Sequence, residues 1–552
     1  MSLSVSGMMK KEPVCYVYEP DQILGLIDFE NDLLALFKAS DKTLFYDYKK
    51  FLHEFHMHED KLVRNIEYVH LMYYLAKPNK GSYPSLDLGL NYTEITLHNL
   101  DELLGKGKKR IAFDAIKEED RLNYMAQAST IIFDSYKPLT DALSSDNVLG
   151  LYNTVEKPLL VVLYSMEKEG IQVDTKVLKE LSDGLAGEID VLEKNIYELA
   201  GEEFNIKSPK QLGHILFDVM GLPVIKKTKT GYSTNADVLD KLKDKDPIIN
   251  QILHYRQLTK LKSTYTDGLF PYVLADGKIH TTFNQTIAAT GRLSSTEPNL
   301  QNIPIRLEQG RLIRKAFIPA EDHVFIDADY SQIELRVLAH ISEDDTFMEA
   351  YRNNLDIHTT TAAQVFHVDF DQVTPSMRRT AKAVNFGIVY GISDYGLSRD
   401  LNIPIAESRE YIERYFEKYP KVKAFLDLTV AKAYDDGFVT TMYNRKRLIP
   451  ELSSSNYMQR QGGERIAMNT PIQGSAADII KIAMIKVYKR LNKENLKAKM
   501  ILQVHDELII EAPKSEEAKV MALLQEEMES AVSLEVPLVA EALTASNWYE
   551  AK

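Results

Sequence analysis

Cysteine is nearly absent from the sequence: Cys15 is the single one among 552 residues. One cysteine excludes an internal disulfide, and such sparing use is typical of a protein from a reducing compartment. Long hydrophobic runs are absent as well, since no segment has the length and apolarity of a transmembrane helix and the N-terminus lacks a signal-peptide pattern. We therefore expect a cytoplasmic protein that does not bind a membrane.

Positive charge is the second scarce feature, since 80 aspartates and glutamates outnumber 66 lysines and arginines and the formal net charge is −14. As an average, this balance argues against a protein that binds nucleic acid. The local field decides binding, however, and basic residues can line one channel while acidic residues cover the outer surface. The hydrophobic share of 45% is ample for several cores, and the length is typical of about three or four domains.

Apolar and acidic residues alternate in the segment 324–330. This pattern predicts a strand that places Asp327 and Asp329 on one face. A carboxylate at the end of a buried strand packs poorly but is a good ligand for a hard cation. Taken alone, the segment is better explained as a half-buried strand with two solvated aspartates.

Two apolar runs flank His505, Asp506 and Glu507 in the segment 499–511. The pattern predicts a β-hairpin with an acidic pair at its tip, which in most proteins is simply a solvated turn. An aspartate at a strand end and another at a hairpin tip can instead share two divalent metal ions. Such a pair of ions holds both the attacking and the leaving oxygen in a displacement at phosphorus.

A third segment carries Arg378, Lys382, Phe386 and Tyr390 at a strict spacing of four residues. On a helix these side chains form one stripe. Its two cations can hold a triphosphate, and its two rings can stack on a base. The alternative is an amphipathic surface helix whose long cations extend into solvent.

These three segments resemble motifs A, B and C of the family A DNA polymerases, and they occur in that order. The matching stretches are residues 329–336, 378–391 and 503–507. The resemblance to the large fragment of the bacterial members of this family runs from about residue 204 to the C-terminus. It implies a multidomain α/β fold of right-hand shape, with an antiparallel palm sheet, helical fingers and a helical thumb, preceded by an N-terminal α/β domain of the ribonuclease H-like exonuclease type.

The resemblance also sets the expected domain boundaries and the expected activity. The parts are a degenerate exonuclease-like domain at 1–150, a thumb with connecting helices at 151–270, a first palm part at 271–335, fingers at 336–455 and a second palm part at 456–552. The implied protein is a template-directed DNA polymerase of replication and repair that adds dNTPs to a primer 3′-OH. It is expected to act on primer–template DNA as a monomer.

Individual roles follow from the same resemblance. Asp329 and Asp506 are expected to bridge two Mg²⁺ ions, for which Mn²⁺ can substitute, with Glu507 as a helper and Asp327 as a structural residue. The residues expected to contact the dNTP are Gln332, Glu334, His358, Arg378, Lys382, Phe386 and Tyr390. Of these, Arg378, Lys382 and His358 are expected to neutralise phosphate charge, and Lys382 is also expected to take part in catalysis.

Polar, turn-rich segments supply the implied DNA contacts. Minor-groove acceptors are nearly degenerate, so Arg, Asn and Gln can test base-pair shape there without reading sequence. The expected residues are Arg292, Asn299, Asn302, Arg465, Asn469, Gln473 and His505, with Lys227 and Lys229 in a thumb loop. The structural alternatives are Asx and Ser turns for 289–302, a surface helix face for 465–473 and a solvated basic loop for 226–232. Pro471 is expected to start a helix.

Two alternatives to a DNA polymerase remain from the sequence. A phage-type single-subunit RNA polymerase shares the two aspartates, but in the DNA-polymerase pattern Glu334 occupies the place of a ribose 2′-OH, where it can also hydrogen-bond Tyr390. A catalytically dead nucleic-acid-binding scaffold is the alternative from another class. The intact pair Asp329 and Asp506 argues against it.

Residues 13–149 resemble the 3′–5′ exonuclease domain only weakly, and the four carboxylates of that chemistry are not found. The opening strand with its Asp-x-Glu should precede residues 14–17, where the sequence predicts a loose start instead. A second carboxylate position falls near Phe51 and a further one on Ala128. A different register could use Asp28, Glu30 and Asp47, but such acids are usually solvated. We therefore expect a structural domain without proofreading activity.

Overall fold

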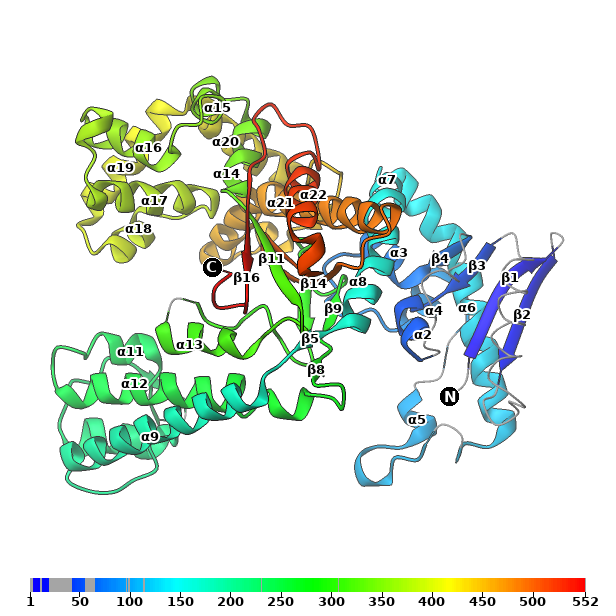
Figure 1. The fold of residues 1–552 in the computed structure, drawn as a ribbon, viewed down its shortest axis with the longest axis horizontal. Coiled ribbons are helices and arrows are strands. Elements are labelled where there is room, and N and C mark those ends of the chain that lie inside the picture. The colour runs from blue at the N-terminus through cyan, green and yellow to red at the C-terminus, as the bar shows by residue number, and fades with distance from the viewer. Residues whose placement is uncertain are drawn as a thin grey trace.

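The structure is a computed structural model that describes residues 3–9, 12–18, 42–54, 65–95, 97, 100–112, 115–229, 231–305 and 307–551. A four-stranded sheet stands at its centre, one helical lobe lies above it and another below on the same side, and a smaller α/β unit lies on the opposite side (Figure 1). This arrangement confirms the predicted multidomain α/β fold. Among the described helices, none combines the length and the apolarity that a membrane crossing requires.

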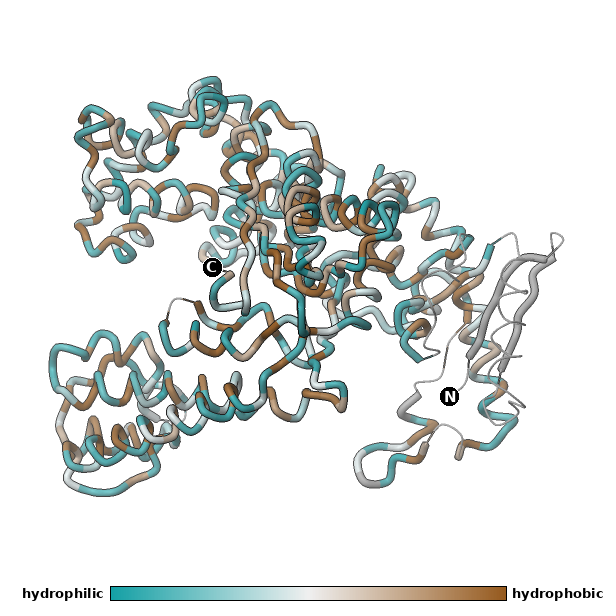
Figure 2. The backbone as a smooth tube through the Cα atoms, viewed as in Figure 1, coloured by the Kyte–Doolittle hydropathy of each residue, from teal (hydrophilic) through white to brown (hydrophobic). Residues whose placement is uncertain are grey.

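Four antiparallel strands form the central sheet in the order β14 (Lys499–Val504), β15 (Glu507–Pro513), β11 (His323–Tyr330) and β16 (Ala540–Ala545). β14 and β15 make the predicted hairpin, in which Val504 pairs with Glu507. Their apolar runs are buried because α8 (Lys157–Glu169) contacts β14 and α22 (Glu517–Glu529) contacts β15. Figure 2 shows hydrophobic residues along these strands and the neighbouring helices. The core thus supports the sheet edge where β11 ends and the hairpin turns.

The upper lobe consists of residues inserted between β11 and β14. Its helices are α14 (Ile333–Ser342), α15 (Asp345–Arg352), α16 (Ile357–Phe366), α17 (Pro375–Val389), α18 (Asp394–Leu401), α19 (Ile405–Lys418) and α20 (Pro420–Asp436), followed by the hairpin of β12 (Phe438–Thr440) and β13 (Lys446–Leu448). α17 begins at Pro375 because the side chain of Thr374 accepts a hydrogen bond from the backbone N–H of Met377. Proline is favoured at the first helical position, where no N–H is needed.

One helix, α21 (Tyr457–Lys493), connects this lobe to the sheet. The predicted helix start at Pro471 is wrong, because α21 runs through Pro471 without a break. Proline removes one intrahelical hydrogen bond, but the residues on both sides of Pro471 are buried by neighbouring elements. That packing outweighs the lost bond, so Arg465, Asn469 and Gln473 share one continuous helical face.

The lower lobe packs two long helices together, α9 (Thr175–Ala200) and α12 (Pro247–Leu261). Asp174 caps α9, since its side chain accepts hydrogen bonds from the backbone N–H groups of the second and third helical residues. Shorter elements complete the lobe, namely α10 (Pro209–Gly213), α11 (Ala236–Asp240) and the hairpin of β6 (Lys227–Thr228) and β7 (Gly231–Tyr232). Lys227 and Lys229 are exposed on this hairpin.

Short elements lead from the lower lobe to the central sheet. They are β5 (Ile171–Gln172) paired with β8 (Lys278–Ile279), β9 (Thr282–Asn284) paired with β10 (Ser294–Thr296), helix α13 (Glu308–Leu312) and the 3-10 turn η9 (Ile313–Ala316). The loop between β9 and β10 carries Arg292. In the sequence this loop lies between the lower lobe and β11.

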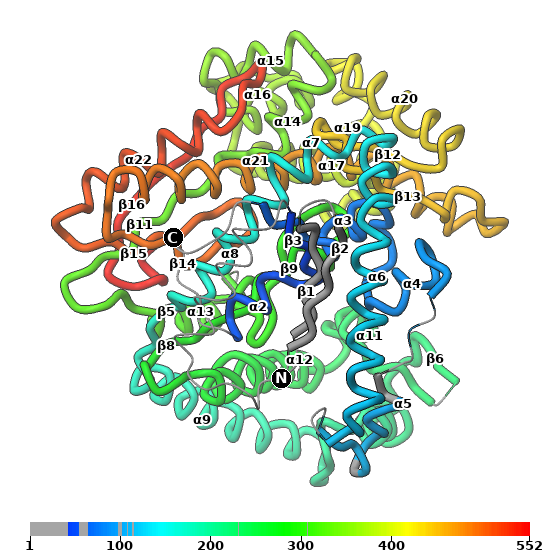
Figure 3. Tube along the Cα trace, turned by 90° about the vertical axis from the view of Figure 1, so that its right-hand side faces the viewer, coloured from blue at the N-terminus to red at the C-terminus, as the bar shows by residue number. Residues whose placement is uncertain are grey.

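The N-terminal unit has its own sheet, in the order β2 (Glu12–Tyr18), β1 (Leu3–Met9), β3 (Lys42–Phe45) and β4 (Ile66–Tyr68). Its helices are α2 (Tyr48–Glu54), α3 (Val69–Ala76), α4 (Ser85–Tyr92), α5 (Leu100–Leu104) and α6 (Glu118–Ser145), and Figure 3 shows the long α6 beside α4. The predicted loose start before residues 14–17 is wrong, because β1 pairs with β2 there. The sequence of β1 contains neither Asp nor Glu, and Asp28 and Glu30 lie outside the described residues.

Candidate active site

The end of β11 meets the tip of the β14–β15 hairpin. Asp329 pairs in register with Glu507 across the sheet. The backbone N–H of Tyr330 donates to the carbonyl oxygen of Asp506 at 3.2 Å. Asp329 and Asp506 are therefore neighbours, although they lie far apart in the sequence.

The acids around this junction differ in their access to solvent. Asp506 lies in the turn and is half-buried, whereas Glu507 begins β15 and is fully buried. The Nε1–H of Trp548 donates to Oε1 of Glu507 at 3.1 Å. On β11, Asp327 is only 3% exposed, while Asp329 is half-buried. Asp329 and Asp506 are thus the two acids of this group that a ligand from solvent can reach.

The predicted stripe of cations and rings lies on α17. Arg378, Lys382 and Phe386 share one face of the helix, and Tyr390 is its C-cap residue. Arg378 forms an ion pair with Asp356, with 2.6 Å between Nη2 and Oδ2. Lys382 is exposed, and its Nζ lies 6.0 Å from the ring centroid of Phe386. The stripe therefore begins with cations near solvent and ends with aromatic rings.

His358 is buried behind this stripe. Nδ2 of Asn385 lies 2.9 Å from its Nδ1 and donates to it when that nitrogen is unprotonated. Burial lowers the pKa of His358 to about 4; the carboxylate of Asp356 opposes this shift, while Arg378 and Lys382 add to it. The imidazole is therefore neutral at pH 7, so that its contact with a phosphate would be a hydrogen bond rather than the charge neutralisation predicted from the sequence.

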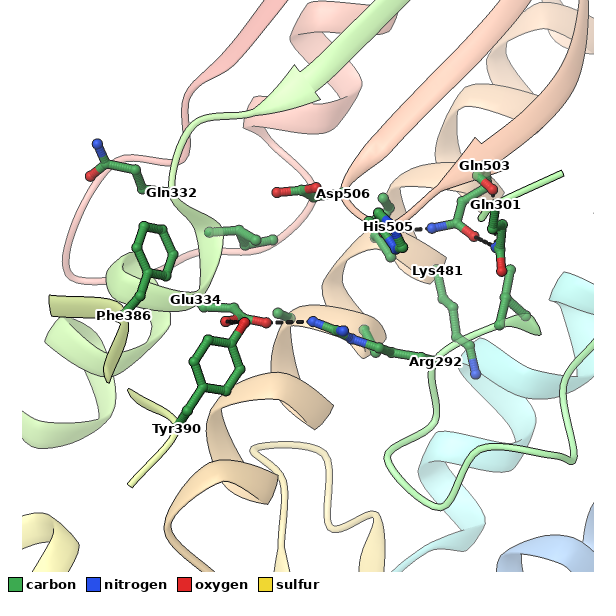
Figure 4. Close-up of a pocket in the computed structure, with 15 residues that line it drawn as sticks. Arg292, Gln301, Gln332, Glu334, Phe386, Tyr390, Lys481, Gln503, His505 and Asp506 are labelled. Carbon is green, nitrogen blue, oxygen red and sulfur yellow. Dashed lines mark hydrogen bonds and ion pairs between the residues drawn. The ribbon is translucent and has the colours of Figure 1, made fainter. Parts of the chain in front are cut away.

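A cavity of about 400 Å³ brings the three sequence motifs together (Figure 4). Its predicted lining residues are Arg292, Gln332, Glu334, Phe386, Tyr390, His505 and Asp506. The other lining residues are Leu293, Gln301, Ile333, Ala476, Ala477, Ile480, Lys481 and Gln503, none of which was predicted. The cavity thus joins the start of α14, the hairpin tip, the end of α17, α21 and the β9–β10 loop.

Glu334 is the polar centre of this cavity. Its carboxylate accepts hydrogen bonds from Oη of Tyr390 at 3.1 Å and from the guanidinium of Arg292. The bond to Tyr390 confirms the one predicted from the sequence. Burial raises the pKa of Glu334, and Arg292 and Tyr390 oppose that shift. Arg292, predicted to contact the minor groove, therefore pairs with the residue predicted to select the sugar.

Two glutamines that were not among the predicted site residues support the hairpin tip. Nε2 of Gln301 donates to the carbonyl oxygen and to Oε1 of Gln503, at 3.1 and 3.0 Å. Nε2 of Gln503 donates in turn to the carbonyl oxygen of His505 at 2.5 Å. Asn299 and Asn302 are exposed, and Asn299 makes the Asx turn of the structural alternative by accepting from the backbone N–H of Gln301 at 3.0 Å.

A buried charge cluster beside the cavity was also missed. Glu156, Arg445, Asp478 and Lys481 are each at most 2% exposed. Arg445 pairs with both Glu156 and Asp478, and Nζ of Lys481 lies 2.6 Å from Oε1 of Glu156. Two charges of each sign cancel, which is the condition for burying them. Gly291 packs on Arg445 at a φ of +83°, where a Cβ would overlap the guanidinium, so the cluster supports the β9–β10 loop.

The α21 face with Arg465, Asn469 and Gln473 is turned toward the end of α17. Nδ2 of Asn469 donates to the carbonyl oxygen of Val389 at 3.4 Å. Arg465 lies against Gly391, just after the end of α17. Arg465 is exposed, as the surface-face alternative expects, whereas Asn469 and Gln473 are half-buried. Lys227 and Lys229, in contrast, lie apart from the cavity, on the exposed hairpin of the lower lobe.

The chain matches proteins of known family over most of its length. Residues 175–550 match the family model described as DNA polymerase family A. Relatives named DNA polymerase I come from Caldicellulosiruptor bescii, at 48% identity over 98% of this chain and 62% of the relative, and from Bacillus caldotenax, at 54% identity over 82% and 52%. The Bacillus subtilis relative is 50% identical over 87% of this chain and 54% of its own length. The chain thus spans 52–62% of the length of these relatives.

A solved structure shares the fold. It is described as the POL domain of Pol1 from M. smegmatis in complex with DNA primer-template and dNTP. The TM-score is 0.87 at 37% sequence identity, over 97% of this chain and 91% of that one. The family match and this common fold show that the chain belongs to DNA polymerase family A.

Proposed function

We propose that the chain is a template-directed DNA polymerase that acts in the cytoplasm, as a monomer, on primer–template DNA. The observation that carries this proposal is that Asp506, Glu334, Phe386 and Tyr390 line one cavity. Asp329 lies next to it, on the strand paired with the hairpin of Asp506. The family membership supports it, as does the similarity to a polymerase domain described with primer-template and dNTP. The proposed parts are a palm at the central sheet, fingers in the upper lobe and a thumb in the lower lobe.

Asp329 and Asp506 fit a divalent metal site. Carboxylate oxygens are the ligands that Mg²⁺ prefers, usually with one or two carboxylates supplemented by water and substrate phosphates. Within the described residues, no group of three or more His, Cys, Asp or Glu is placed to hold a metal, so we propose that the triphosphate and water complete the site. Two ions bound there would lower the pKa of the primer 3′-OH and stabilise the charge of the pyrophosphate leaving group.

The remaining residues bind and orient the dNTP. The primer 3′-oxygen forms a bond to the α-phosphorus as the α–β phosphate bond breaks, and its proton passes to solvent. Lys382 is exposed and available to a phosphate, and Arg378 is exposed as well, although its Nε and Nη2 donate to Asp356. His358 donates a neutral hydrogen bond. The rings of Phe386 and Tyr390 shape the site of the new base pair.

Primer extension in Mg²⁺, with dNTPs compared with rNTPs, tests this proposal against its alternatives. Extension with dNTPs and not with rNTPs supports a DNA polymerase. Efficient rNTP use identifies the phage-type RNA polymerase alternative. Binding of primer–template without any extension identifies a catalytically dead scaffold.

We expect Phe386→Tyr to improve the use of dideoxynucleotides about 10- to 100-fold relative to dNTPs, since a hydrogen bond gained in a polar site is worth about 1.5–3 kcal/mol. Phe386 lines the cavity, and an added hydroxyl there can replace the contact that a missing 3′-OH would have made. The measurement is the ratio of ddNTP to dNTP incorporation efficiency in both proteins. Equal ddNTP use by both would show that this ring does not lie near the 3′ position.

We further expect no 3′–5′ proofreading activity, because two-metal hydrolysis needs several convergent carboxylates. Phe51 is 3% exposed in α2 and packs in the core, and Ala128 lies on α6. Asp47 already serves as a cap, accepting from the backbone N–H of Lys50 at 3.1 Å. An end-labelled primer with a mismatched 3′ end, incubated with Mg²⁺ and no dNTPs, should keep its length. Steady shortening that Asp47→Ala abolishes would refute the prediction.

A further inference from the structure

Trp548, the one tryptophan of the sequence, is fully buried behind the proposed metal site. Its Nε1–H donates to Oε1 of Glu507 at 3.1 Å. The ring packs edge-on against Phe317, with 5.3 Å between centroids, and its backbone N–H donates to the carbonyl oxygen of Phe317 at 3.0 Å. The indole is therefore fixed by its backbone, by a neighbouring ring and by the carboxylate that it bonds.

Arg314 holds the face of the same indole. Its guanidinium carbon lies 4.2 Å from the Trp548 ring centroid, which is a close cation–π contact. Arg314 is 2% exposed, and its Nε and Nη1 are buried without a hydrogen-bond partner among the described residues. Burial lowers the pKa of Arg314, while the charges of Glu507 and Asp327 oppose that shift. Burying an arginine without hydrogen bonds costs free energy. The nearby carboxylates and the indole ring compensate that cost.

The contacts that run from Arg314 through Trp548 lead to Glu507, which lies beside the predicted metal ligands. Glu507 follows Asp506 in the chain and pairs in register with Asp329. A rotation of the Glu507 side chain would therefore disturb the backbone and the field at both aspartates. Groups that hydrogen-bond a metal ligand set its orientation, and their removal typically costs about 10- to 100-fold in metal affinity or activity. We extend this rule to Glu507 because it lies directly beside both proposed ligands.

We propose that Trp548 and Arg314 are positioning residues of the polymerase site. Trp548 fixes the carboxylate of Glu507 behind Asp329 and Asp506, and Arg314 stabilises the indole from its face. This inference rests on the proposed function. It has a spectroscopic consequence, because a divalent ion at the aspartates would be the largest local charge and would change the field along the hydrogen bond between Glu507 and the only indole.

Trp548→Phe and Phe317→Leu form a matched pair of variants. The first removes the N–H donor and keeps an aromatic ring for Arg314; the second removes a packing ring and keeps the donor. We expect Trp548→Phe to lower kcat about tenfold and to raise the Mg²⁺ concentration for half-maximal rate about tenfold, with little change in the KM for dNTP. Phe317→Leu should lose thermal stability while its kcat and Mg²⁺ dependence stay close to the parent values.

The emission of Trp548 supplies a second, independent measurement. The parent protein, bound to a primer–template with a dideoxy-terminated primer, is titrated with Mg²⁺ and dNTP so that no chemistry occurs. We expect a saturable change in emission that Asp506→Ala abolishes. Emission that does not respond, or equal losses of kcat in the two variants, would overturn the inference. Primer extension by the parent protein decides the proposed function separately, and the emission titration still decides the coupling where Trp548→Phe fails to fold.

Discussion

Asp329→Ala and Asp506→Ala are each expected to reduce primer extension by at least about a thousandfold, because losing a metal ligand should cost at least as much as losing one preorganised hydrogen-bond donor, about 10²- to 10³-fold in kcat. Each variant removes one of the two carboxylates that are proposed to hold both metal ions. Binding of primer–template should remain intact or become slightly tighter, because phosphate contacts elsewhere supply most of the affinity and a negative charge has been removed. Single-turnover extension and DNA binding, measured on the same preparations, check the two expectations.

Asp327→Asn is the matched control for this prediction. Asp327 lies on the same face of β11 as Asp329, two residues earlier, but it is buried. Its substitution should change thermal stability and leave most of the extension rate in place. Near-native extension by Asp329→Ala, or a loss in Asp327→Asn as large as in Asp329→Ala, would contradict the assignment of the metal ligands.

The site could be predicted from the sequence wherever one local pattern carries both a structure and a chemistry. The alternation that ends in Asp329, the apolar runs around Asp506 and the four-residue spacing on α17 each specify an element and the face on which its polar residues lie. Their meeting point does not follow from any one of them. It follows from the pairing of β11 with β15, which brings Asp329 opposite Glu507.

Residues whose partners lie far away in the sequence could not be predicted. The local sequence does not distinguish Gln301 from its polar neighbours, because its partner Gln503 is 202 residues further along the chain. Lys481 belongs to an apolar, helical stretch and is explained only by Glu156, which lies 325 residues before it. Pro471 has the local signature of a helix start, and tertiary packing overrides that signature.

The charge state of a residue also depends on burial that a sequence does not show. His358 lies two residues after a helix-capping aspartate and precedes three threonines, a context that is compatible with an exposed imidazole. The structure buries it, and its pKa falls to about 4. In the proposed site His358 would therefore meet a phosphate as a neutral hydrogen-bond donor, which would leave the positive charge there to Arg378 and Lys382.

The selection of the sugar is the second large effect that we expect, and it centres on Glu334. This side chain is 7% exposed and is held from two sides by Tyr390 and Arg292. We propose that a ribose 2′-OH would lie against this fixed carboxylate, where it would be desolvated and would clash. Glu334→Ala should therefore lower the preference for dNTPs over rNTPs about a hundredfold, which corresponds to ~2.7 kcal/mol.

Glu334→Gln separates the volume of this side chain from its charge. Glutamine retains the size and can still accept from Tyr390, so we expect it to keep most of the discrimination against rNTPs. Both variants should add dNTPs more slowly, because Arg292 loses its ionic partner. The measurement is the ratio of dNTP to rNTP incorporation efficiency for the parent protein and both variants. An unchanged ratio in Glu334→Ala would place the gate elsewhere, and an equal fall in Glu334→Gln would show that charge rather than bulk excludes the ribose.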